Sequence, residues 1–288
     1  MIVCPECEIK LEKKNTFYKC KKCNKKIEII NDIYLFNPEI ITNNKDYKAD
    51  WLDKLYQYEK KYFWFRIRKK IIKKYFKKFI NFKDKIIEIG SGTGYIAKSL
   101  IDSGYKNYSV GDIHKNGLLY SKNYNFKKLY QFDLLKSPFI NEFNTVCMFD
   151  VLEHIKDEKK AVINIHKMLK KNGKIILTVP AHMCLWSNID KIAGHKRRYN
   201  LKMIKDLLMK NGFKILIAKH FFCLILPFLF IRTLLNKKNE DFDEKKSGIK
   251  INYLINSVLF ILSWIENIIL ANFLPRIGGS IIVVGRKK

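Results

Sequence analysis

Apolar and polar positions follow two alternating patterns through most of the chain. Short runs of consecutive apolar residues are typical of strands buried on both faces, and between them apolar residues recur every three or four positions, as on one face of a helix. The runs predict strands over residues 85–89, 108–113, 129–132, 142–149, 174–179, 213–219 and 280–284, and the periodic stretches predict helices over 94–102, 157–171 and 200–209. Gly173 follows the second helix, as a C′ glycine would. This alternation predicts a doubly wound, seven-stranded α/β sheet with a ligand site at the carboxyl ends of its strands.

Two further segments lie outside this alternation. Helical spacing runs from Tyr47 to Phe79, and between the last two strands residues 221–277 carry two apolar runs around a charged break, 236–246. The second run, 251–274, is long enough to span a bilayer, but Glu266 inside it and the return to a core strand argue against spanning. We expect an interfacial anchor or a channel for an apolar substrate, with a buried helical cap or a dimer interface as the alternative.

Composition and charge narrow the range of partners. The 288 residues include 56 basic and 27 acidic side chains, a formal charge of +29, which favours polyanions such as nucleic acid, an anionic lipid surface or phosphorylated substrates. Most of the basic residues are lysines, and Ile and Asn are abundant too, so the charge alone does not indicate RNA. Because the N-terminus carries a cysteine motif and no signal peptide, we expect a cytoplasmic protein, with peripheral attachment at the inner face of the membrane as an option.

Four of the seven cysteines form two C-x-x-C pairs near the N-terminus. Twelve residues separate the pair Cys4 and Cys7 from the pair Cys20 and Cys23. Two such pairs complete a tetrahedral site, so residues 1–37 resemble a zinc ribbon, in which four protein ligands make Zn²⁺ structural rather than catalytic. Redox-active or incidental cysteines are the alternative. The predicted organisation is then a ribbon over 1–37, a linker with N-terminal helices over 38–82, and a core domain over 83–288.

Three glycines at alternate positions mark the junction between the first core strand and its helix. The junction reads Glu88-Ile89-Gly90-Ser91-Gly92-Thr93-Gly94. Glycines there permit left-handed backbone angles and close approach of a ligand, and the following helix start offers free N–H groups. A tight strand-to-helix turn that binds nothing is the alternative.

Together with the order of motifs that follows, this junction resembles that of the class I methyltransferases, which use S-adenosylmethionine (SAM). The resemblance covers residues 45–288 and implies a Rossmann-like sheet. It also implies that the glycine-rich loop, with Gly90, Ser91, Gly92 and Gly94, holds the amino-acid end of SAM while Glu88 orients it. Asp112 at the tip of the second strand would accept the ribose hydroxyls, with a solvated loop acid as the alternative. Asp133 and Leu134 after the third strand would contact the adenine.

The segment after the fourth strand carries candidate catalytic chemistry. It reads Asp150-Val151-Leu152-Glu153-His154-Ile155 and matches the family's segment facing the transferring methyl group. The match places Asp150 in the cofactor site. His154 is a candidate proton acceptor because imidazole titrates near neutrality, although it can equally hold the start of a helix.

The connection over residues 181–199 is unusually rich in functional groups for a loop. Its Trp-Ser, Asp and Gly-His-x-Arg-Arg-Tyr pattern resembles a branch of these methyltransferases with poorly defined substrates. His195 is a second candidate base. The substrate-binding candidates Arg197 and Arg198, together with Tyr199, would grip a carboxylate or phosphate. The alternative is a salt-bridged loop that orders a lid.

The function implied by the resemblance is SAM-dependent methyl transfer. The apolar insertion favours a small or lipid-linked acceptor. One alternative is a ribosomal RNA methyltransferase that recognises RNA through its zinc ribbon, although no Asn-Pro-Pro-Tyr-type motif occupies residues 150–153. The other is a non-catalytic SAM-binding subunit attached to a partner through the ribbon.

Overall fold

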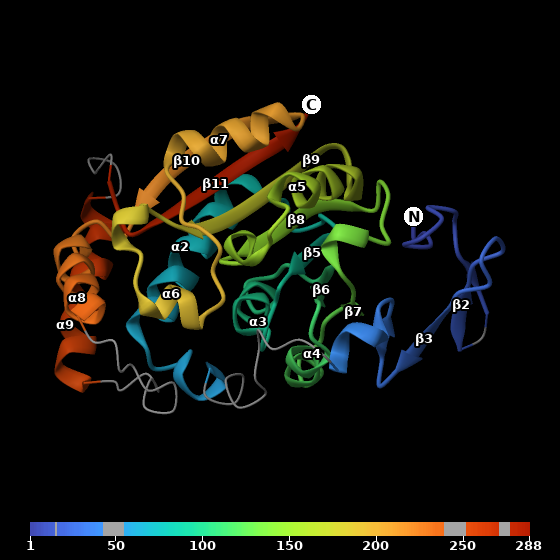
Figure 1. Ribbon diagram of the computed structural model, residues 1–288, viewed down its shortest axis with the longest axis horizontal. Coiled ribbons are helices and arrows are strands. Elements are labelled where there is room, and N and C mark those ends of the chain that lie inside the picture. The colour runs from blue at the N-terminus through green and yellow to red at the C-terminus, as the bar shows by residue number, and fades with distance from the viewer. Residues whose placement is uncertain (15, 43–54, 239–251, 271–276) are drawn as a thin grey trace.

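The protein's structure, a computed structural model, describes residues 1–14, 16–42, 55–238, 252–270 and 277–288. Within these residues eleven strands form one sheet in the order β1-β2-β3-β4-β7-β6-β5-β8-β9-β11-β10. Figure 1 shows the N-terminal strands at one end of the molecule and the helices α8 and α9 at the opposite end.

Seven strands of this sheet form the predicted doubly wound core. They are β5 (Ile86–Ile89), β6 (Tyr108–Asp112), β7 (Leu129–Gln131), β8 (Phe143–Phe149), β9 (Leu169–Pro180), β10 (Phe213–Phe221) and β11 (Ser280–Lys287). The strands from β5 to β9 pair parallel, whereas β11 pairs antiparallel with both β9 and β10. Because the inner strands are buried on both faces, they read as unbroken apolar runs, which is why the sequence located them.

The helices of the core are α3 (Tyr95–Ile101), α4 (Lys115–Ser121), α5 (Glu158–Met168) and α7 (Leu201–Lys210). The side chain of Asn200 accepts a hydrogen bond from the Met203 N–H at 2.9 Å and so caps α7 as predicted. The prediction that α5 runs to residue 171 and ends at Gly173 is wrong. Helix α5 ends at Met168, the backbone is extended from Leu169, and both Asn172, with φ of 61°, and Gly173 already lie in β9.

The cysteine-bearing segment is continuous with the core sheet. It contains β1 (Glu12–Lys13), β2 (Phe17–Lys19), β3 (Lys26–Ile30) and β4 (Ile33–Leu35). Asn31 and Asp32 take left-handed angles and fold β3 and β4 into a hairpin. Strand β4 then pairs parallel with β7, and the Val3 N–H donates to the Pro138 carbonyl at 2.8 Å. The segment therefore extends the core sheet and shares its hydrophobic core.

The helical segment before the core is shorter than predicted within the described residues. The 3₁₀ helix Pro38–Thr42 follows β4, residues 55–58 are helical, and a turn over 59–62 leads into α2 (Phe63–Phe79). Helix α2 buries the side chains of Phe63, Ile67, Ile71, Ile72 and Phe76. Residues 43–54, which belong to the predicted linker and N-terminal helices, lie outside the described residues.

The apolar insertion forms α8 (Leu226–Lys238) and α9 (Tyr253–Ile265), which continues as a π-helix over Glu266–Leu270. Asn256 of α9 accepts a hydrogen bond from the Phe63 N–H at 2.8 Å, which fixes α9 to the start of α2. The carboxylate of Glu266 accepts hydrogen bonds from the Cys223 and Leu224 N–H groups, so this acid stabilises the loop between β10 and α8. None of the helices in the described ranges combines the length and apolar character needed to cross a membrane. Residues 239–246 of the charged break lie outside the description.

Candidate active site

A cavity of about 340 Å³ opens at the carboxyl ends of the adjacent strands β5, β6, β7 and β8. Its wall includes seven of the residues predicted to bind cofactor or act in catalysis: Gly90, Gly92, Asp112, Asp133, Leu134, Asp150 and His154. The described residues that line it do not include the predicted Glu88, Ser91, Gly94, His195, Arg197, Arg198 or Tyr199. The parallel sheet thus brings together residues from four separate parts of the sequence.

Asp112 connects the end of β6 to the glycine-rich loop. Its Oδ2 accepts a hydrogen bond from the Gly92 N–H at 2.9 Å, and its Oδ1 accepts one from the His114 N–H at 2.9 Å. Burial raises the pKa of this carboxyl, and the two N–H groups oppose that effect. The carboxylate is therefore fixed in position at the cavity wall, where a ligand hydroxyl can donate to it.

Gly92 leaves room for a ligand, and Gly117 lets α4 pack closely against the glycine-rich loop. Gly92 has φ of 52°, and a Cβ atom there would meet no protein atom within 4 Å, so the space beside it belongs to the cavity. A Cβ at Gly117 would lie 2.7 Å from the Gly92 carbonyl oxygen, so only glycine lets α4 approach the loop this closely. Sequence reasoning missed Gly117, although a glycine inside a helical stretch was an available signal.

Glu88 lies behind the loop rather than in the cavity wall. Its carboxylate accepts a hydrogen bond from the Tyr108 hydroxyl at 2.6 Å, and burial raises the pKa of Glu88 to about 8. Glu59, which the sequence did not single out, supports the loop directly: both its oxygens lie 2.7 Å from the hydroxyl of Thr93, which donates to them. Burial raises the pKa of Glu59 to about 7.

Asp133 and Leu134 follow β7, beside the strand that joins the cysteine-bearing segment to the core. Asp133 caps the 3₁₀ helix Leu134–Lys136 by accepting from the Leu135 N–H at 2.8 Å. Asn37, which comes just after β4, accepts from the Asp133 N–H at 3.2 Å and exchanges hydrogen bonds with the side chain of Gln131. Residues of the cysteine-bearing segment thus position one wall of the cavity, a role that sequence reasoning missed.

Asp150 holds a left-handed backbone angle, φ 55°, at the end of β8. Its carboxylate accepts a hydrogen bond from the Thr178 hydroxyl at 2.8 Å and forms an ion pair with Arg68 of α2. This ion pair brings α2 to the cavity rim. The same helix also packs against the core through its buried side chains.

His154 and His195 lie together although 41 positions separate them. The centroids of their imidazole rings are 4.7 Å apart, and both rings lie beside the carboxylate of Glu153. The 3₁₀ helix Leu152–His154 supplies two of these residues, and the loop after α6 (Asn188–Ile192) supplies the third. Burial raises the pKa of Glu153 well above its usual range.

Arg197, Arg198 and Tyr199 make their contacts within the protein. Arg197 pairs with Glu158, which also accepts a hydrogen bond from the Tyr199 hydroxyl at 2.6 Å. Arg198 donates two hydrogen bonds to Asp190, at 2.8 and 3.0 Å. Burial opposes ionisation of Asp190, but hydrogen bonds from His195 and Arg198 lower its pKa to about 2. These contacts correspond to the salt-bridged loop, and a substrate-gripping role for the three residues stays a prediction.

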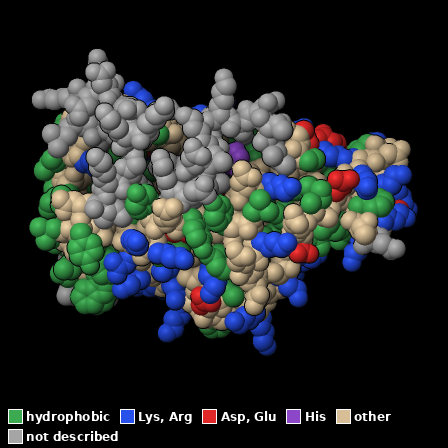
Figure 2. Space-filling view, turned by 90° about the horizontal axis from the view of Figure 1, so that it is seen from below, with side chains coloured by type: hydrophobic (Ala, Val, Ile, Leu, Met, Phe, Trp, Pro, Cys, Tyr) green, Lys and Arg blue, Asp and Glu red, His purple; other side chains and the backbone are tan. Residues whose placement is uncertain are grey.

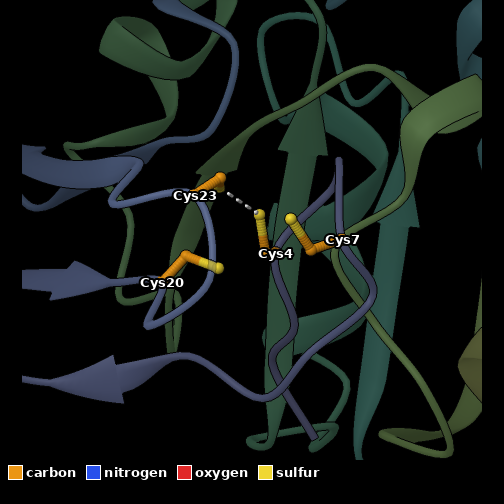
Figure 3. A group of neighbouring side chains, drawn as sticks. All are labelled: Cys4, Cys7, Cys20 and Cys23. Atoms are coloured by element: carbon orange, nitrogen blue, oxygen red, sulfur yellow. Dashed lines mark hydrogen bonds between the residues drawn. The ribbon is translucent and has the colours of Figure 1, made fainter.

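The four N-terminal cysteines form a second candidate site, for a metal ion. Figure 3 shows their thiol groups turned toward a common centre. The four sulfur atoms lie within 4.8 Å of one another, and Sγ of Cys4 is 3.6 Å from Sγ of Cys23. Four sulfurs at Zn–S bonds of about 2.3 Å stand about 3.8 Å apart in a tetrahedron, so this arrangement fits Zn²⁺.

The residues of the cavity fit SAM. The space beside Gly92 that a Cβ atom would fill, the fixed carboxylate of Asp112 and the wall at Asp133 and Leu134 follow the order in which SAM presents its amino-acid end, ribose and adenine. Fixed carboxylates and glycine-rich turns of this kind are suited to the ribose and polar groups of a nucleoside ligand.

Comparison with known proteins identifies the family. The sequence model of the family described as "Methyltransferase domain" matches residues 56–217, more than half of the chain. The chain therefore belongs to this family, and it is an enzyme with the fold of the class I SAM-dependent methyltransferases. None of the curated proteins is significantly similar to it in sequence.

Solved structures agree on the fold. The chain resembles a phosphoethanolamine N-methyltransferase of Haemonchus contortus in complex with phosphomonomethylethanolamine and S-adenosylhomocysteine, with a TM-score of 0.54 and 17% identity over 88% of this chain. It spans 62% of that protein's length. It also resembles a SAM-dependent methyltransferase of Thermotoga maritima, with a TM-score of 0.52 and 14% identity over 83% of this chain and 96% of the other. At these identities the likeness concerns the fold alone.

Proposed function

We propose that the enzyme transfers the methyl group of SAM to a small or lipid-linked acceptor that reacts through oxygen. The observation that supports this proposal is the cavity at the ends of β5 to β8, whose wall contains both the predicted cofactor-binding residues Gly92, Asp112 and Asp133 and the candidate base His154. SAM, when bound, supplies a methyl group on a positively charged sulfur. The chain's own residues bind SAM and the acceptor, orient them toward each other and exclude water from the site.

The cofactor half of the cavity is a positioning device. Gly92 and Asp112 fix the glycine-rich loop against β6, and Asp133 lies one strand farther along. Holding both reactants in line supplies much of the acceleration in a displacement of this kind, because it replaces a chance encounter by a fixed geometry.

His154 lines the part of the cavity that we assign to the acceptor, and Glu153 and His195 lie next to His154. Among the described side chains near the cavity, these three residues form a compact group that can accept protons or bind a metal ion. We propose that the two histidines act on the acceptor's reacting hydroxyl, which must lose its proton during the reaction.

The surface of α8 and α9 supports an apolar or lipid-linked acceptor. Exposed apolar side chains gather there, among them Tyr253 and Leu254, which are 82% and 73% exposed, and Figure 2 shows hydrophobic side chains at that end of the molecule. Exposed lysines of the adjacent α2, Lys70, Lys73, Lys74, Lys77 and Lys78, supply positive charge. We propose that this end of the molecule lies against an anionic membrane surface.

Vesicle flotation tests the membrane part of the proposal. The full chain should float with vesicles that contain anionic lipid and should float less with purely zwitterionic ones. Leu254→Asp should reduce flotation severalfold, whereas Leu119→Asp, at an exposed apolar position on α4, should not. Equal flotation of both variants, or none for the native chain, would refute this part.

We also propose that the four cysteines hold a structural Zn²⁺. The convergence of their sulfur atoms supports this, and four protein ligands leave no open position for catalysis. Metal analysis of the purified chain should find zinc that is lost in Cys20→Ser. Absence of zinc from the native chain would instead favour free thiols.

The proposed acceptor class is tested by tracing the methyl group. Labelled SAM and the enzyme are incubated with extract from cells that lack the enzyme, and lipid, small-molecule and RNA fractions are then separated. Label in the lipid or small-molecule fraction supports the proposal. Label in RNA would make the ribbon and the lysines the recognition surface, and no transfer despite SAM binding would favour a non-catalytic subunit.

A further inference from the structure

Glu153, His154 and His195 form a cluster of metal-ligating side chains beside the cofactor cavity. Each offers a ligand atom, and these atoms lie within 4.8 Å of one another. His154 also lines the cavity, as does Gly194, the residue before His195. The cluster therefore lies next to the part of the cavity wall formed by His154 and Gly194, and it is far in sequence from the four cysteines.

The carboxylate of Glu153 lacks the partners that its burial requires. The residue is 0% exposed, and neither of its oxygens has a hydrogen-bond partner in the described part of the chain. An isolated carboxylate is costly to bury, and buried polar groups are nearly always satisfied. A cation between Glu153 and the two imidazoles would remove this cost.

His195 is held as a metal-ligating histidine usually is. Its Nδ1 lies 2.8 Å from Oδ1 of Asp190, which is almost fully buried and is itself gripped by both hydrogen bonds from Arg198. When Nδ1–H donates to that carboxylate, Nε2 keeps its lone pair for a ligand bond. A carboxylate on the outer nitrogen is the common support for a metal-bound imidazole.

We propose that Glu153, His154 and His195 bind a divalent transition-metal ion that keeps an open coordination position toward the cavity. Two histidines and one carboxylate are a known donor set for catalytic ions with an open position, such as Zn²⁺, Mn²⁺ or Fe²⁺. The open position takes the hydroxyl oxygen of the acceptor. This second statement rests on the proposed function, whereas the binding of the ion does not.

The bound ion would supply the activation that methyl transfer to a hydroxyl needs. Coordination lowers the pKa of the hydroxyl, so its proton passes to water. The oxygen's electron pair forms the new C–O bond to the methyl carbon as the C–S bond breaks, and sulfur keeps the electron pair of that bond in neutral S-adenosylhomocysteine. The ion keeps its charge, and no oxidant or reductant takes part.

Manganese titration tests the site on the full chain with zinc already in the cysteine site. Mn²⁺ suits a site with a carboxylate ligand, whereas thiolates favour Zn²⁺, so loss of the free-Mn²⁺ electron paramagnetic resonance signal reports this cluster. We expect one Mn²⁺ to bind per chain. Glu153→Gln and His195→Gln should abolish binding, and Asp190→Asn should weaken it by roughly 10–100-fold. Glu59→Gln, at a buried carboxylate outside the cluster, should leave it unchanged.

Mn²⁺ binding that is absent from the native chain, or that is equal in the native and Glu153→Gln chains, would overturn the proposal. Circular dichroism checks that each variant is folded. If Glu153→Gln does not fold, His195→Gln takes its place in the comparison. SAM binding, measured by calorimetry on the same samples, separates the two proposals. SAM binding without Mn²⁺ binding refutes the metal site alone, and Mn²⁺ binding without SAM binding refutes the proposed function while supporting the metal site.

Discussion

The Asp112 carboxylate accepts a hydrogen bond from the backbone N–H of Gly92 at 2.9 Å. This bond joins the second core strand, β6, to the glycine-rich loop that follows the first core strand, β5. This bond fixes the two groups that would contact the ribose and the amino-acid end of SAM. Asp112→Ala should therefore weaken SAM binding by about tenfold to a hundredfold, because hydrogen bonds to a charged group contribute roughly 1.5–3 kcal/mol. Calorimetric titration measures this, and an unchanged dissociation constant would remove Asp112 from the site.

Gly92 offers a matched test of the space that the cofactor needs. Gly92→Ala should weaken SAM binding strongly, since its Cβ enters the cavity, and it should also cost about 1–2 kcal/mol of backbone strain. Gly104→Ala is the control, because Gly104 also has a positive φ, 108°, but lies outside the cavity wall. Both variants should lose stability in chemical denaturation, and only Gly92→Ala should lose SAM affinity. Equal affinities in the two variants would contradict this assignment.

Glu59 should make stability depend on pH. Burial raises its folded-state pKa from 4.5 to about 7, so the folded state binds the proton more tightly than the unfolded state. The contribution of protonated Glu59 to the free energy of unfolding is fully present below pH 4.5 and is lost as pH rises to about 7. This change is up to about 3 kcal/mol. Glu59→Gln stays neutral, so relative to the native chain it should gain stability between pH 5 and pH 8. Urea unfolding at both values checks this, and a constant difference would show that Glu59 is ionised throughout.

The cysteine-bearing segment should influence cofactor binding. Strand β4 pairs with β7, and Asn37 bonds to Gln131 and Asp133 at the cavity wall. Loss of the proposed zinc in Cys20→Ser should therefore lower both the melting temperature of the whole chain and its SAM affinity. Asn37→Ala, which leaves the cysteines intact, should lower SAM affinity while retaining zinc. Native affinity in both variants would mean that the segment acts independently of the core.

The sequence located the core strands and most of the cavity because both depend on local patterns. Buried parallel strands read as apolar runs, and residues that follow them, such as Asp112 and His154, necessarily meet at one edge of the sheet. The glycine-rich loop was recognisable for the same reason. These features need no knowledge of how distant segments pack.

Contacts between distant segments could not be read from the sequence. Nothing local to Asn37 signals that it will bond to residues 94 positions away, and nothing local to Arg68 signals its pairing with Asp150. The prediction that Gly173 ends a helix failed because the chain becomes extended at Leu169, directly after α5, and Gly173 already lies in β9. Glu153 drew no attention because its lack of partners is a property of the packed structure.

A crystal structure with bound S-adenosylhomocysteine tests the central claim most directly. The account predicts the ribose hydroxyls on Asp112, the adenine beside Asp133 and Leu134, the amino-acid end against Gly92, and the sulfur directed toward His154. Binding of the molecule elsewhere, or binding in this cavity without contact to Asp112 and the Gly92 loop, would contradict the account.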